Sequence, residues 1–241
     1  MAQRGSFFSS IPPVTKNLII INVLMWLSTI VFRNAGIVDL DQYLALHHYR
    51  ASNFGVWQLL TCMFMHDTSL GFRSFAHIFF NMFNLWMFGG LIERRLNNKR
   101  YLFYYLTCGI GAALVQLIVW HFELAPVVAA TQAGQIIVDS EGQQLTLEMF
   151  TTLGASGAVF GILLAFGMLF PNLKMYVIPF PFPVKAKWMI LGYGVLEFLF
   201  DVSGTMSGVA HFAHLGGMLA GVVLLLYWKR KGALGGRNGY F

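Results

Sequence analysis

The chain is a series of long apolar runs separated by shorter polar or charged segments. A run that crosses a bilayer as a helix needs roughly 20 residues, at about 1.5 Å of rise each. We identify six such runs, at about 14–32, 75–92, 101–122, 157–170, 188–200 and 208–228. The fourth and fifth are short for a complete crossing. The pattern predicts an all-α membrane protein with a six-transmembrane-helix bundle.

Three segments between the runs have patterns of their own. WQLLTCMFMH (57–66) is aromatic and too short to span, so we expect it to lie in the membrane interface. Polar and apolar residues alternate over 132–148, which is typical of a small hairpin. The prolines of the segment 171–187 exclude a helix interior and predict a linker.

We therefore expect a single membrane domain over residues 1–241. Its expected appendages are a short cytoplasmic N-terminus at 1–13, an outer-loop insert at 123–152 and a flexible glycine-rich tail at 232–241. The first apolar run is not followed by a small-residue cleavage site, so we expect it to remain as a helix.

Composition and charge agree with a membrane location. The chain is 57% hydrophobic and only 11% charged, whereas soluble domains carry about 25% charged residues. If both termini are cytoplasmic, 13 of the 16 lysines and arginines lie on the inner side, and only Arg33, Arg50 and Arg73 lie outside. This bias indicates the topology of the chain and contact with anionic lipid. We expect a multi-pass protein of a bacterial-type plasma (inner) membrane. No aromatic–basic module is visible, so nucleic-acid binding is not expected.

Polar side chains inside the apolar runs are candidates for function, because each costs several kcal/mol in lipid unless it is paired or faces water. Helical rise, counted from the expected inner helix ends, places Ser156 and His214 at roughly 22 Å, and His77 and Asn81 at roughly 24 and 18 Å. His211 falls at roughly 27 Å, nearer the rim. Four polar side chains on three helices are therefore expected at nearly one depth.

Small residues predict which helix faces meet. Gly157 and Gly161 on the fourth run, and Gly217 and Gly221 on the sixth, have the small-xxx-small spacing that lets helix backbones approach closely. His214, Gly217 and Gly221 share one face of their helix. The face that can pack tightly therefore also presents His214 to the fourth helix.

A serine and a histidine brought together in this way predict an activated nucleophile, with the imidazole of His214 as general base for Ser156. The free N–H groups at the start of the fourth helix, with Asn81 and His77, could bind a developing oxyanion. We find no Asp or Glu at this depth to orient His214, so the expected arrangement is a dyad rather than a triad.

At these residues the chain resembles the rhomboid family of intramembrane serine proteases. The resemblance covers about 55–228, and the motifs that carry it are HIFFN (77–81), GASG (154–157), AHLGGMLAG (213–221) and FGGLIERRL (88–96). One departure is Gln58, which follows Trp57 where the family has arginine.

The resemblance implies that Ser156 is the nucleophile and His214 the base, with His77, Asn81 and the Ser156 amide as the oxyanion hole. The supporting positions that match the family are Gly154, Gly157, Phe160, Gly217 and Gly221, with Phe160 expected to stack on the base. It implies a serine endopeptidase without metal or cofactor. Its expected partners are transmembrane protein substrates with small residues at the cleaved bond, which enter laterally near the second and fifth helices.

Simpler interpretations of single residues stay open. Ser156 alone is often a packing residue, and His77 and Asn81 alone are often interhelical hydrogen-bonding residues. His211 is expected to be a satisfied or rim histidine rather than the base. The remaining expectations are that His66 and His121 are solvated or hydrogen-bonded, and that Glu197 and Asp201 at the outer end of the fifth helix face water, with substrate gating as the alternative.

Three other functions compete with proteolysis by serine. A b-type haem protein could use His77, His211 and His214 as ligands, but it leaves Ser156 and its glycines unexplained. A metalloprotease is disfavoured because no His-Glu-x-x-His motif is present. A catalytically inactive rhomboid-like binding protein is disfavoured because Ser156 and His214 are both present.

Overall fold

The computed structural model describes residues 11–69, 71–138, 141–176, 182–203 and 211–234, without the side chains of 200–203. Helical elements dominate it. In chain order they are α1 (Pro13–Asn34), α2 (Asp41–Leu44), α3 (Gln58–Thr61), η2 (Cys62–Phe64), α4 (Phe72–Asn84), η3 (Leu85–Gly89), α5 (Gly90–Leu96), α6 (Asn98–Glu123), α7 (Ala125–Gln132), η4 (Leu147–Met149), α8 (Ser156–Leu169), α9 (Ala186–Ser203) and α10 (His211–Arg230). Two antiparallel pairs join β1 (Leu46–His47) to β2 (Thr151–Thr152) and β3 (Lys174–Tyr176) to β4 (Pro183–Lys185).

Four of the described helical segments are long and apolar enough to cross a membrane: Pro13–Asn34, Phe72–Leu96, Asn98–Glu123 and His211–Arg230. They match the first, second, third and sixth expected crossings. The second contains a π-helical turn, η3, between α4 and α5. The expected fourth and fifth crossings are the helices α8 and α9, and the total of six crossings stays a prediction.

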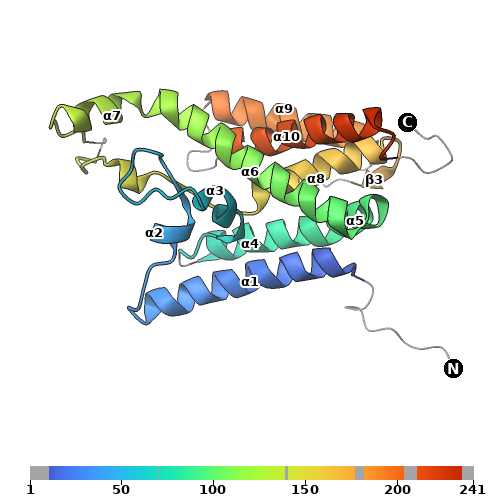
Figure 1. The fold of residues 1–241 in the computed structure, drawn as a ribbon, viewed down its shortest axis with the longest axis horizontal. Helices are drawn as coiled ribbons and strands as arrows, with labels where there is room; N and C mark the ends of the chain where they lie inside the picture. Colours follow the sequence, from blue (N-terminus) through green and yellow to red (C-terminus); the bar gives the residue numbers. More distant parts are fainter. Residues whose placement is uncertain (1–10, 70, 139–140, 177–181, 204–210, 235–241) are drawn as a thin grey trace.

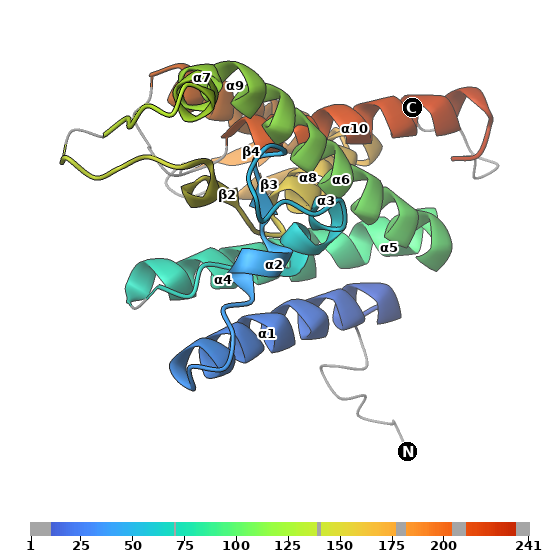
Figure 2. The same ribbon diagram turned by 60° about the vertical axis from the view of Figure 1, so that its left-hand side comes forward.

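The long helices lie side by side, with α8 between α1 and α4 on one side and α9 and α10 on the other (Figures 1 and 2). The start of α1 and the end of α10 lie at the same end of the bundle (Figure 1). Ten of the 14 residues of α8 are buried, which agrees with its sequence, since a helix that is apolar all round is typical of a protein core or of a membrane span. This short central helix carries Ser156 at its first position.

Glycines set the distance between the central helices. A Cβ added to Gly217 of α10 would lie 1.9 Å from the carbonyl oxygen of Gly157 of α8, and one added to Gly157 would lie 2.3 Å from the Cβ of Ala112 of α6. Only glycine permits these approaches, so the expected packing of the Gly157 and Gly217 faces is confirmed.

The segments between the helices partly follow the expectations. An antiparallel bridge between Val138 and Gln144 supports the hairpin, but the insert also contains the helix α7, which the alternation did not predict. In its described residues, 171–176 and 182–187, the proline-rich linker contains β3 and β4, and α9 begins at Ala186. The expected tail 232–241 lies mostly outside the described residues.

Much of the segment 57–66 packs against the helix bundle, and its expected place in the membrane interface stays a prediction. Trp57 is exposed, but Cys62, Met63, Met65 and His66 are buried. Apolar and polar side chains in this stretch both find partners inside the protein, and the segment thereby forms one wall above the start of α8.

Candidate active site

The backbone before α8 is held by the outer segments of the chain. Thr151 and Thr152 pair with His47 and Leu46, and the N–H of Gly154 donates to the Cys62 carbonyl at 3.0 Å. Gly154 has φ +129°, a conformation that disfavours any residue with a side chain. The chain then enters α8 at Ser156, where the first N–H groups of the helix have no intrahelical partner.

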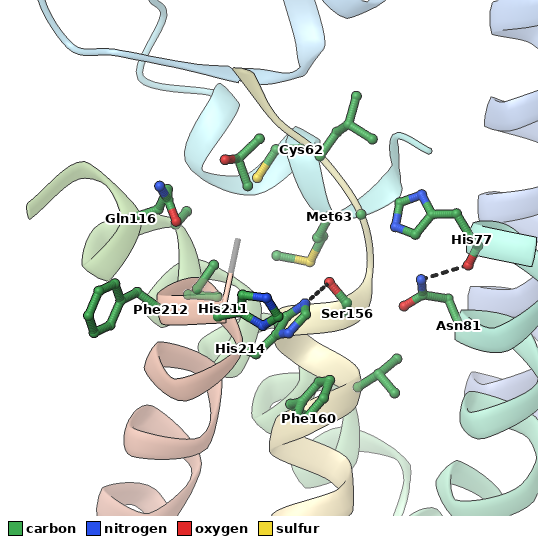
Figure 3. Close-up of a pocket in the computed structure, with 18 of the residues that line it drawn as sticks. Cys62, Met63, His77, Asn81, Gln116, Ser156, Phe160, His211, Phe212 and His214 are labelled. Carbon is green, nitrogen blue, oxygen red and sulfur yellow. Dashed lines mark hydrogen bonds between the residues drawn. The ribbon is translucent and has the colours of Figure 1, made fainter. Parts of the chain in front are cut away.

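His214 of α10 lies directly against Ser156. Its Nε2 is 2.8 Å from the Ser156 Oγ, a hydrogen-bond distance (Figure 3). The ring of Phe160, one turn further along α8, stacks on the His214 ring with centroids 4.4 Å apart and planes 7° apart. The expected pairing and stacking are both present, and the close approach of Gly157 and Gly217 brings the two helices into register for them.

The other side of the His214 ring contacts a carboxylate, and here the sequence-based expectation was wrong. Glu197 of α9 places Oε2 2.7 Å from His214 Nδ1, and the same oxygen is 2.6 Å from His211 Nδ1. The Glu197 side chain is 15% exposed rather than facing water. The expectation failed because α9 continues to Ser203, which places Glu197 deeper than an end near residue 200 implied. The side chain of Asp201 lies outside the described residues.

These contacts fix the protons on the histidine rings. A carboxylate only accepts hydrogen bonds, so the Nδ1 atoms of both histidines carry the protons that Glu197 binds. Nε2 of neutral His214 then has a free lone pair and accepts from the hydroxyl of Ser156. His211 does not contact Ser156 in this way: its ring is nearly perpendicular to that of His214, at 89°. His211 therefore bonds Glu197 through Nδ1, and Ser156 is paired with His214, in line with the expectation that His211 is not the base.

His77 and Asn81 reach the same cavity from α4 (Figure 3). The N–H of Asp67 donates to His77 Nδ1 at 3.3 Å, so Nε2 of this ring carries the proton. A Cβ added to Gly154 would lie 3.0 Å from this Nε2, so the His77 ring lies against the backbone just before the start of α8. The Asn81 amide donates to the His77 carbonyl at 2.9 Å, which uses one of its two N–H bonds.

The cavity has a volume of about 1240 Å³ and is lined by residues of α4, α6, α8, α9 and α10. Its lining includes Ser156, His214, His77, Asn81 and Phe160, so the four side chains that we expected at one depth open into one space. Pockets that enclose a drug-sized ligand measure about 300–1,000 Å³. This space is large enough for several residues of an extended peptide.

Two further histidines, His66 and His121, have hydrogen-bond partners that the sequence pattern did not identify. His66 is buried and its Nε2 lies 2.9 Å from Asn22 Oδ1; burial lowers its pKa to about 3, which keeps the ring neutral. Nδ1 of His121 bonds the Tyr49 hydroxyl at 2.7 Å. Both histidines are therefore hydrogen-bonded, one of the two roles expected for them.

Gln58, which stands where the family has arginine, is fully buried and supports the outer loop. Its Oε1 accepts from the N–H of His47 at 3.2 Å, and its Nε2 donates to the carbonyl of Asn53 at 2.8 Å and to that of Tyr43 at 3.3 Å. A neutral amide satisfies three backbone groups here. No motif in the sequence indicates these partners, because they depend on how the loop folds back.

Within the described parts of the chain, one trio could offer metal ligands: ligand atoms of Glu197, His211 and His214 all lie within 4.8 Å of one another. Both Nδ1 atoms of the trio hydrogen-bond the same carboxylate oxygen. The trio is therefore already linked by two N–H donors that share one carboxylate oxygen.

Comparison with known proteins agrees with the geometry. A sequence model of the Rhomboid domain matches residues 53–231. The chain belongs to the rhomboid family. Its membership and its four candidate spans make it a multi-pass membrane protein.

Several rhomboid relatives cover most of this chain. Rhomboid protein 1, mitochondrial, of Saccharomyces cerevisiae is 28% identical over 195 residues, which cover 70% of this chain and 48% of that protein. Rhomboid-like protein 11, chloroplastic, of Arabidopsis thaliana is 30% identical over 230 residues (86% and 62%). Rhomboid protease AarA of Providencia stuartii is 26% identical over 218 residues (88% and 70%). The match thus spans about half of the yeast protein and less than two-thirds of the plant one.

Proposed function

We propose that this rhomboid is a serine endopeptidase that hydrolyses peptide bonds in or near the transmembrane segments of other membrane proteins. The observation that carries the proposal is the 2.8 Å contact between Ser156 Oγ and His214 Nε2 at the head of α8, inside a cavity of the helix bundle. The similarity to a bacterial protein named as a rhomboid protease supports it.

The chemistry follows the usual course of acyl transfer. Ser156 Oγ bonds to the peptide carbonyl carbon while its proton moves to His214 Nε2. The electron pair of the C=O π bond moves to the oxygen, which becomes the oxyanion. The C–N bond then breaks, and the leaving amine takes the proton from Nε2. Water attacks the acyl-serine and gives a proton to Nε2; that proton returns to Oγ as the ester bond breaks and the carboxyl product leaves.

The oxyanion needs hydrogen-bond donors that are already in place. The Ser156 N–H at the start of α8, the Nε2–H of His77 and the amide of Asn81 are the donors that we assign to it. The tautomer of His77 supports this assignment, because its Nδ1 is occupied by the N–H of Asp67 and its Nε2 side faces Gly154.

The substrate class follows from the position of the site among membrane helices. A peptide bond within a helix has its carbonyl hydrogen-bonded and shielded, so a transmembrane substrate must unwind locally before Ser156 can attack it. We propose six crossings, with α8 and α9 as the fourth and fifth, and both termini on the cytoplasmic side of an inner membrane. The common end of α1 and α10 supports an even number of crossings (Figure 1).

The competing functions fit the site less well. Haem ligation by His214 would have to displace its contact with Ser156 or with Glu197, and it gives no role to Ser156. An inactive binding protein needs neither the paired Ser156 and His214 nor the stacked Phe160.

The test is labelling with a fluorophosphonate probe in mild detergent, alongside cleavage of a helical transmembrane substrate in liposomes. Wild type should react and cleave, and S156A and H214A should do neither; S52A, which changes a serine of the outer loop, should behave as wild type. Activity should survive a metal chelator. A folded wild type that neither reacts nor cleaves overturns the proposal, and a Soret band would then assign the histidines to haem.

A further inference from the structure

The geometry points to Glu197 as a positioning residue. Its carboxylate, held by His211, orients His214 for proton transfer, so Ser156, His214 and Glu197 form a triad in place of the expected dyad. This inference rests on the proposed function. Glu197 lies outside every motif that carries the rhomboid resemblance, so neither the motifs nor the comparisons assign it a role.

The contact has the geometry of a charge-assisted hydrogen bond. The Glu197 Oε2 to His214 Nδ1 distance of 2.7 Å lies at the short end of the range for N–H groups bonded to ionised oxygens. The side chains of Glu197 and His214 are only 15% and 11% exposed. Little water competes for this contact, which strengthens its effect on the ring.

His211 accounts for the presence of a carboxylate at this depth. A buried charge is costly unless hydrogen bonds compensate for lost water, and His211 supplies a second donor to the same oxygen at 2.6 Å. His211 and His214 lie three residues apart on α10 and so share one face of it, and the Nδ1 atoms of both rings reach Glu197 of α9. The pair holds Oε2 between them and limits the rotamers open to Glu197.

The consequence for the reaction is control of the His214 tautomer and orientation. Because Glu197 binds the proton on Nδ1, the Nε2 lone pair faces the hydroxyl of Ser156 before reaction. When the serine proton arrives on Nε2, the ring becomes positively charged and the carboxylate stabilises that charge. The proton on Nδ1 stays there throughout, so Glu197 neither gains nor loses a proton.

The experiment compares E197Q, E197D and wild type by kcat, KM and the pH dependence of cleavage. E197Q keeps the size of the side chain and removes its charge; we expect kcat to fall by about 10²- to 10⁴-fold with KM within about twofold. E197D should recover part of the loss because it restores the charge at a longer distance. E141Q, which makes the same charge change in the outer insert, should match wild type.

The pH profile separates a positioning role from a structural one. The acidic limb of the kcat profile should move to lower pH in E197Q, because the protonated ring loses its anionic neighbour. The other titratable side chains that line the cavity in the described parts of the chain are Cys62, Asp67, Arg73, His77, Glu123, Tyr193 and His211; none changes in this comparison. H211N, whose amide can replace the Nδ1–H donor, should retain more activity than H211L.

Two outcomes overturn the inference. One is an E197Q enzyme with kcat within about threefold of wild type and an unmoved acidic limb. The other, which does not depend on a variant folding, is a ¹⁵N spectrum of histidine-labelled wild type in which neutral His214 carries its proton on Nε2. A wild-type protein that does not cleave would instead contradict the proposed function, so failure of this inference and failure of the proposed function are distinguishable.

Discussion

The close contact between α8 and α10 yields a quantitative prediction for Gly217. In G217A the new Cβ would lie 1.9 Å from the carbonyl oxygen of Gly157. The oxygen is part of the α8 backbone, and the position of the Cβ is fixed by the α10 backbone. Real Cβ atoms keep at least 3.0 Å from such a neighbour, so the helices must separate or slide by about 1.1 Å. No side-chain rotation can relieve this contact.

That displacement acts on stability and on activity together. Overpacking of a tight helix contact costs typically about 1–3 kcal/mol. Gly157 follows Ser156 directly, and Gly217 lies one turn beyond His214, so the movement also disturbs the 2.8 Å contact between the serine and the histidine. A misplacement of about 1 Å can lower a rate by about 10²-fold. We expect G217A to lose roughly that much kcat even at temperatures where it stays folded.

The assay is thermal unfolding followed by a thiol-reactive dye, since Cys108 is free and fully buried and becomes reactive on unfolding; C62S serves as the background, because Cys62 lines the cavity. Cleavage is measured in parallel below the transition. The matched control is G192A on α9, where an added Cβ meets nothing within 4 Å and stability should be unchanged or higher. If G217A had the midpoint and kcat of G192A, the argument from helix contact would be refuted.

Three further predictions concern single side chains. F160L should lower kcat by roughly 2- to 10-fold because it removes the ring that stacks on His214, whereas F160Y should keep most activity. E93Q should lower the unfolding midpoint, because buried Glu93 accepts hydrogen bonds from the N–H and hydroxyl of Thr15 at the start of α1, and charged acceptors contribute about 1.5–3 kcal/mol each; an unchanged midpoint would contradict this. Because burial lowers the pKa of His66 from 6.5 to about 3, the unfolded chain binds more protons between these values, and stability should decrease as pH falls below 6.5, by up to about 1.4 kcal/mol per unit. H66Q should flatten this dependence, and an equally steep decrease in H66Q would assign it to other groups.

The local sequence pattern predicted most of the helices and, within the site, the pairing of Ser156 with His214. The apolar runs predicted α1, α6 and α10 to within a few residues, because runs of this length are stable in lipid only as helices. The short motifs around Ser156 and His214 predicted their pairing, because the glycine spacing and the helical period place both on faces that can approach closely. These inferences use neighbours in the sequence and need no knowledge of the rest of the fold.

Partners from other elements could not be predicted in this way. Glu197 was expected to face water, and its bond to His214 depends on the depth at which α9 sits against α10. Gln58 departs from the family, and its three backbone partners appear only when the outer loop folds back. His66 and Asn22 are 44 residues apart and meet between different elements.

The sequence by itself determined where the helices form and which serine and histidine can meet, because hydrophobic length, helical period and glycine spacing act over a few turns. The tertiary structure alone decided the surroundings of that pair: the carboxylate behind His214, the tautomer of His77 and the cavity onto which they open. A polar group takes its partner from whichever helix faces it, and the relative depth and rotation of two helices are set by packing along their whole length. That is why the pairing of Ser156 and His214 was visible in the motifs, whereas its third member was not.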